Sequence, residues 1–154
     1  MANPTSVLMV ELVMSIDRLI DSARAAQPDS ELWPAAVGLS HIADVDETVW
    51  LPRLELMVAA HAAHQEAPSF QWWEPDTTGT LERYREVLID DAGARAMATR
   101  IAMLMRLRDL TPQEWAATAQ HDTFGEIDVA GLVFAQLAHD EEHRASLVLP
   151  RSTS

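Results

Sequence analysis

Two histidines near the C-terminus have the spacing of a metal-binding pair. His139 and His143 are four residues apart in a stretch of helical periodicity, so their imidazoles project from one helix face within reach of each other. Neutral imidazole nitrogen is a common ligand of zinc and also suits nickel and iron. Two ligands do not close a site, and His41 is the candidate for a third. The structural alternative is a hydrogen-bonded histidine pair whose charge is offset by the neighbouring acidic residues.

Three other metal sites can be weighed from the same sequence. His139-x-x-Glu142-His143 matches the inverted metalloprotease motif, in which the glutamate is the general base, but so short a pattern arises easily by chance in an acidic chain. A di-iron bundle needs Glu-x-x-His pairs on two helices, and the sequence has none. His61 and His64 are expected on a solvated helix end. The three-histidine set is therefore the metal site that the sequence favours.

Composition restricts the function further. The net charge is −13, with 24 acidic and 11 basic residues, so phosphate backbones and anionic lipid are repelled and neither nucleic acid nor membrane is an expected partner. The chain has no cysteine, which excludes disulfides, thiolate ligands and an internal thiol nucleophile. No signal peptide or membrane span is recognised at the start, and we expect a cytoplasmic protein. A length of 154 residues predicts one domain over residues 1–154.

Apolar residues recur at helical spacing along most of the chain, and no strand-like alternation is found. The pattern predicts an all-α fold, a four-helix bundle. One long crossover loop is expected at residues 68–79, and a short extra helix with Trp115 is expected before the last helix, begun by a capping box at Thr111 and Glu114. The long helices are expected at 5–26, from between 30 and 34 to about 67 with a kink at Pro52, at 81–109 interrupted near Gly93, and from the cap Asp128 to about 149.

Trp72 and Trp73 occupy the crossover loop. Long loops inside compact domains are often lids or interface plugs. Two tryptophans can also simply cap the open end of a core, so both interpretations stay open.

Three short stretches carry a resemblance to a known family. Residues 38–47, which include His41, resemble the histidine-bearing second helix of the DinB/YfiT-like family of metal-dependent enzymes. Residues 121–127 and 138–143 resemble that family's H-x-x-F-G and H-D-x-x-H motifs. Each motif is short, but the three occur in the family's order and the resemblance covers most of the chain.

The resemblance implies a four-helix bundle, commonly a homodimer, with one divalent metal held by three histidines. By matching position these are His41, His139 and His143. His121 is expected either to fix the conformation of its loop or to contact the ligand side chains without binding the metal itself. Asp44 and Asp140 could orient a ligand imidazole, but we interpret both as solvated charges on helix faces.

Family members with known activities include transferases that use a small cellular thiol such as mycothiol, bacillithiol or glutathione. For this chain the resemblance implies a metal-dependent thiol S-transferase, or a related detoxifying activity, on a small-molecule substrate. Because the chain has no cysteine, any thiolate must come from a co-substrate. The alternative is a non-catalytic dimeric bundle that binds a metal or a small ligand.

Overall fold

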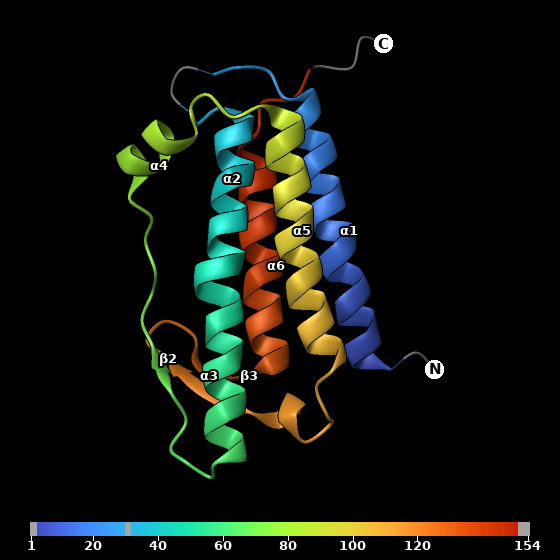
Figure 1. Ribbon diagram of the computed structural model, residues 1–154, viewed down its shortest axis with the longest axis vertical. Coiled ribbons are helices and arrows are strands. Elements are labelled where there is room, and N and C mark those ends of the chain that lie inside the picture. Colours follow the sequence, from blue (N-terminus) through green and yellow to red (C-terminus); the bar gives the residue numbers. More distant parts are fainter. Residues whose placement is uncertain (1–2, 30–31, 151–154) are drawn as a thin grey trace.

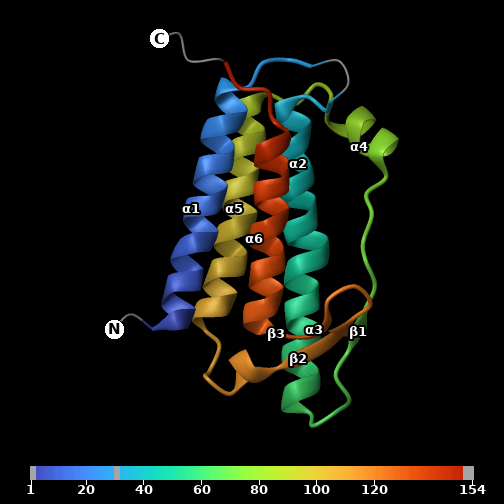
Figure 2. The same cartoon turned by 180° about the vertical axis from the view of Figure 1, so that it is seen from behind.

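The computed structural model describes residues 3–29 and 32–150 and shows the predicted four-helix bundle (Figure 1). One of the four rods is α2 continued by a π-helical turn and α3, seen as a single column in both ribbon views (Figure 2). The elements of the bundle are α1 (Pro4–Ala25), α2 (Ala35–Val45), the π-helical turn (Asp46–Trp50), α3 (Leu51–Ala62), α5 (Ile89–Arg108) and α6 (Val129–Ser146).

The second rod begins just after its predicted range and contains a π-helical turn beside Pro52. It begins at Ala35 after the cap Pro34, and residues 30 and 31 of the expected start lie outside the described residues. The sequence predicts a kink at Pro52, with the helix resuming after it. The rod is continuous there, with Pro52 in the first turn of α3 and the π-helical turn directly before it, so the backbone distortion near this proline takes the form of a widened turn.

The predicted third helix is interrupted at a different place. It divides into α4 (Thr77–Tyr84), which stands off the bundle in Figure 1, and α5, which begins after Leu88. Gly93 lies inside α5 and lets it pack closely on α1, since an added Cβ would meet Ile20 Cγ2 at 3.3 Å. The glycine at position 93 therefore permits a close contact between two helices and does not mark the end of a helix.

A small sheet closes one end of the bundle, and the prediction of no strand was therefore wrong. It contains β1 (Ser69–Phe70), β2 (Thr118–His121) and β3 (Gly125–Asp128) in the order β1-β2-β3. β1 and β2 are parallel, with Phe70 opposite His121, and β2 and β3 are antiparallel, with Gln120 opposite Glu126. Strands of two to four residues are too short to show a period.

The short extra helix and its capping box are confirmed. Glu114–Ala116 forms one 3-10 turn before β2. The Thr111 backbone N–H donates to Glu114 Oε1 at 2.9 Å, and the Glu114 N–H donates to Thr111 Oγ1 at 3.1 Å. These reciprocal bonds satisfy two donors at the helix start.

The bundle core has two apolar clusters with a polar layer between them. Leu12, Met103 and Leu132 belong to the cluster nearer the sheet, and Ile16 and Ala96 belong to the other. The layer is made of buried polar side chains, namely Ser15, Asp46, Arg100, Gln136 and Asp140. In residues 3–29 and 32–150 every helix is too short or too polar to span a membrane.

Candidate metal centre

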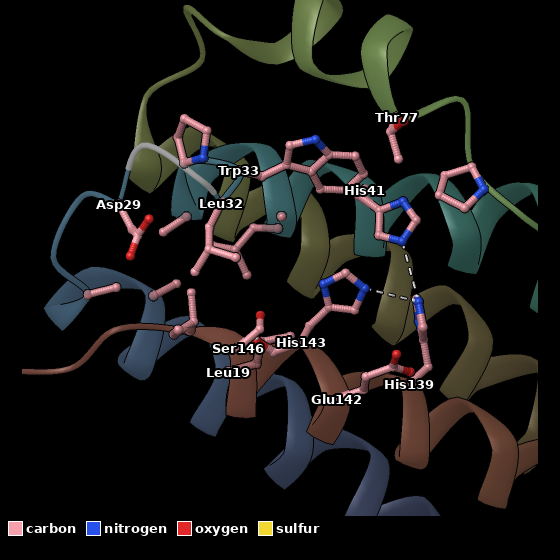
Figure 3. Close-up of a pocket in the computed structure, with 18 of the residues that line it drawn as sticks. Leu19, Asp29, Leu32, Trp33, His41, Thr77, His139, Glu142, His143 and Ser146 are labelled. Atoms are coloured by element: carbon pink, nitrogen blue, oxygen red, sulfur yellow. Dashed lines mark hydrogen bonds between the residues drawn. The ribbon is translucent and has the colours of Figure 1, made fainter.

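The three histidines singled out in the sequence converge in the structure. Nε2 of His139 lies 3.3 Å from Nε2 of His41 and 3.2 Å from Nε2 of His143. One ligand atom from each residue lies within 4.8 Å of the other two, a spacing that could hold a metal ion. Figure 3 shows the His41 and His143 rings side by side, both directed at the same nitrogen of His139, and their ring centroids are 4.8 Å apart.

These distances agree with the dimensions of a tetrahedral site. Zinc–imidazole bonds of about 2.0–2.1 Å at tetrahedral angles place neighbouring nitrogens about 3.3 Å apart. Two of the three edges of the histidine triangle therefore already have the length that a bound cation requires.

Helix positions explain why the rings meet. His139 and His143 are one turn apart on α6, which begins where Asp128 Oδ1 accepts from the Gly131 N–H at 2.8 Å. His41 comes from α2 and is buried, with 3% of its surface exposed. The site joins two helices that are far apart in sequence and adjacent in the bundle.

Burial keeps the three imidazoles neutral at pH 7. It lowers the pKa of His41 to about 4, with a further contribution from His143 that Asp44 opposes. It lowers the pKa of His139 to about 3, with further contributions from His143, His41 and Arg100. Burial also lowers the pKa of His143, against Glu142 and Asp140. Neutral imidazole is the form that binds a metal.

Aromatic rings wall the site. Trp73 stacks on His41 with ring centroids 5.9 Å apart, and Trp33 meets the same ring edge-on at 5.2 Å. The Trp50 ring lies 6.2 Å from that of His139. These rings bury part of the histidine surface, and the remaining side opens on the cavities described below.

The tryptophans of the crossover loop lie over this site. Trp72 and Trp73 are 52% and 38% exposed, and both line the larger cleft beside the histidines. The loop is fastened to the β2–β3 turn, because the Trp72 backbone N–H donates to both carboxylate oxygens of Asp122, at 2.9 and 3.0 Å. A lid over the site and a cap over the end of the core both agree with this position.

Two cavities meet at the histidines. The larger is a cleft of about 560 Å³ between the ends of α1, α2 and α6, lined at one end by apolar side chains that include Leu19 and Leu32 (Figure 3). The smaller has a volume of about 110 Å³ and lies toward β2 and α3. Trp72, Trp73, His139 and Glu142 line both.

The interpretation of Asp140 as a solvated charge was wrong. Its carboxylate is 1% exposed, pairs with Arg100 and accepts from Ser15 Oγ at 2.8 Å. Asp44 is partly exposed and accepts from Tyr84 Oη at 2.6 Å and from Arg95 at 2.8 Å. In the described part of the chain, neither aspartate is hydrogen-bonded to a ligand imidazole.

Arg100 is the residue that sequence reasoning missed. It is fully buried and donates to Asp140, to Asp46 and to the carbonyl of Leu12. Burial opposes the charged form, but these partners outweigh burial and raise the pKa of Arg100. Gln136 donates to Asp46 at 2.9 Å. An arginine inside the apolar stripe of a helix was the signal, since such a residue needs a buried counter-charge.

The remaining histidines behave as expected from the sequence. His121 fixes its turn, because its Nδ1 accepts from the N–H groups of Thr123 and Phe124 at 3.0 and 3.3 Å. Gly125, which ends this turn, has φ of +72°, a conformation that glycine adopts without strain. His61 and His64 are exposed on the end of α3.

Solved structures share this fold. YfiT from Bacillus subtilis, described as a probable metal-dependent hydrolase with an unusual four-helix bundle topology, matches with a TM-score of 0.72 and 16% identity over 94% of this chain and 85% of that one. A mutant of the mycothiol-dependent maleylpyruvate isomerase matches with a TM-score of 0.65 and 8% identity over 97% of this chain. The present chain spans 63% of the isomerase.

Sequence comparison gives the family. No curated protein matches the chain. The profile of one sequence family, the DinB superfamily, matches residues 10–147, which include all three converging histidines. The chain therefore belongs to the DinB superfamily.

Proposed function

We propose that this protein is a metal-dependent enzyme in which His41, His139 and His143 hold one divalent cation, zinc, nickel or iron. The observation that carries the proposal is the approach of three neutral imidazole nitrogens at the spacing of a tetrahedral site, beside an open cleft. Three protein ligands leave a coordination position for a water or a substrate. A dication held there would lower the pKa of a water or thiol bound to it and polarise a carbonyl.

For the reaction we propose transfer of a small cellular thiol to an electrophilic carbon. The thiol loses its proton, its sulfur forms a bond to the carbon, and the bond from that carbon to its leaving group breaks, so that the leaving group departs with the electron pair, as chloride does in the assay below. Glu142, which lines both cavities, is the proposed acceptor of the thiol proton. Three observations support this: the chain has no cysteine of its own, the cleft of about 560 Å³ has room for a thiol co-substrate, and one structural neighbour is described as mycothiol-dependent.

Metal analysis tests the site. We expect the purified protein to carry stoichiometric metal and His41→Ala, His139→Ala and His143→Ala each to lose most of it. His61→Ala is the matched control, since His61 is an exposed histidine away from the cluster. Equal metal contents in all five proteins would show that the assignment is wrong.

Turnover tests the reaction. The metal-loaded protein would be assayed with mycothiol, bacillithiol and glutathione against monochlorobimane, which fluoresces once conjugated. We expect at least one thiol to be conjugated faster than by His143→Ala. No enhancement with any of the three thiols would count against transferase activity and leave the metal site to its own test.

Hydrolysis is the second candidate, favoured by the position of Glu142. This carboxylate precedes His143 and lines the cleft in which the histidines meet, where it could serve as a general base toward water. Ester hydrolysis by the metal-loaded protein that is lost in Glu142→Gln, without thiol conjugation, would favour this candidate.

A further inference from the structure

The smaller cavity contains an arginine that forms no ion pair in the described part of the chain, although the charge of Asp122 acts on it from a distance. All 11 basic residues of the chain are arginines, against 24 acidic residues, yet within residues 3–29 and 32–150 Arg53 and Arg85 form no ion pair. Arg53 lines the smaller cavity. Its guanidinium is held over the Phe70 ring at 4.9 Å, and Nη2 donates to the Gln71 carbonyl at 2.7 Å. The cation is therefore fixed in place with donors to spare.

His121 contributes a second donor to this cavity. Because its Nδ1 accepts two backbone N–H bonds, the proton of the neutral ring must be on Nε2. In the described part of the chain this Nε2–H has no hydrogen-bond partner. The ring lines the cavity, so the free donor is available to a ligand.

Trp50 adds an aromatic ring whose signal can report on this cavity. Its indole N–H is buried and lacks a partner among the described residues. A buried unsatisfied donor in a native structure calls for an explanation, often a ligand or an ordered water. Trp50 lines the smaller cavity beside His139.

The rest of the lining suits an anion with a small apolar body. It consists mostly of apolar side chains, Val45, Val49, Phe124, Ala135 and Ala138 among them. The acidic member is Glu142, an exposed residue shared with the larger cleft. Charge-assisted hydrogen bonds from arginine to carboxylate are among the stronger polar contacts.

We infer that the smaller cavity binds the carboxylate of a small electrophilic substrate, held by Arg53 and the Nε2–H of His121 beside the Trp50 ring. This inference rests on the proposed function for the role of that substrate. A carboxylate bound there leaves the rest of the molecule beside His139, and the thiol approaches from the larger cleft on the other side. The enzyme would then act on carboxylic acids in preference to their neutral analogues.

The test compares propionate with propionamide, its neutral analogue of equal size, by titration calorimetry and by the indole N–H signals in nitrogen-15 NMR spectra. We expect propionate to bind at least about tenfold more tightly and to shift the Trp50 indole signal, identified as the one missing in Trp50→Phe. Arg53→Gln should weaken propionate binding by about tenfold to a hundredfold and leave propionamide unchanged. Arg53→Lys should retain part of the preference, and Arg85→Gln is the matched control.

Several outcomes would overturn the inference. These are equal affinity for the two probes in the wild-type protein, unchanged propionate affinity in folded Arg53→Gln, or an unmoved Trp50 indole signal. His41→Ala separates this inference from the metal proposal. Retained propionate binding in that variant supports the cavity, and abolished binding means that the cation held the carboxylate. If the protein binds no metal at all, the proposed function fails and the wild-type titration still decides the cavity.

Discussion

Arg100 and Asp140 form a bidentate ion pair in the middle of the bundle, with Nη1 to Oδ2 at 2.7 Å and Nη2 to Oδ1 at 2.8 Å. Asp140 directly follows His139 on α6, so this ion pair holds the candidate ligands of α6 at one position along the bundle axis. The same guanidinium reaches Asp46 and the Leu12 carbonyl. One side chain thus ties α6 to α1, α5 and the π-helical turn.

Removing Arg100 should be costly. Arg100→Met leaves Asp46 and Asp140 buried and uncompensated, and we expect the free energy of unfolding to fall by about 3–5 kcal/mol, measured by urea denaturation. Arg95→Met is the matched control, because its pairs with Asp44 and Glu47 are partly exposed and should be worth under about 1 kcal/mol. A similar loss of unfolding free energy in the two variants would show that the buried ion pairs stabilise the protein no more than the exposed ones.

The metal-free protein should lose stability as the pH falls. The pKa of His41 is about 4 and that of His139 about 3 in the folded state, against about 6.5 when unfolded. Between these values the unfolded chain binds more protons, so the free energy of unfolding is highest above about pH 6.5 and declines toward about pH 4. Urea titrations in a chelator at about pH 7 and about pH 5 measure the difference.

A matched pair of variants isolates the histidine contribution from that of the carboxylates. Changing His41, His139 and His143 together to Gln should flatten the pH dependence, and changing the exposed His61 and His64 should not. Parallel curves for the triple variant and the wild type would contradict the assignment.

Stripping the metal should leave the bundle folded. The two apolar clusters contain none of the three histidines, so we expect an unchanged far-UV circular dichroism spectrum and a cooperative melt at lower temperature. Loaded protein should be more stable by about 2.7 kcal/mol when free metal is about 100 times its Kd. Collapse of the helical signal without metal would instead indicate a structural site, whose binding energy is folding energy, and would favour the non-catalytic alternative.

Trp73 should report on occupation of the larger cleft. It stacks on His41 and lines that cleft, so a bound thiol should change the tryptophan fluorescence of the wild-type protein. Trp73→Phe should abolish most of the change and retain the metal. Trp115→Phe should keep the change, since Trp115 packs against the apolar cluster near the sheet. A response that follows protein dilution and ignores the thiol would indicate an interface plug.

The sequence predicted the four helices and the histidine pair because both depend on local periodicity. His41 was a candidate third ligand from its residue type alone, and only the family resemblance matched it to a ligand position, since no spacing rule relates residues from separate helices. The three short strands could not be predicted from the sequence, because the parallel pairing of Phe70 with His121 is a tertiary contact between distant residues. Arg100 was missed for the same reason: its partners Asp46 and Asp140 lie 54 and 40 residues away.

The π-helical turn at Asp46–Trp50 holds one residue more than an α-helical turn would. Five π-helical residues turn through about the same angle as four α-helical ones, so deleting one residue here would restore an ordinary α-helix and leave α3 near its present place. His41, upstream of the turn, and Arg53, downstream of it, would then keep their positions, whereas the side chains of the turn itself, Trp50 among them, would be displaced. A single-codon change at this point therefore gives evolution, or an engineer, a way to exchange the residue beside His139 while the trio of imidazoles stays unchanged.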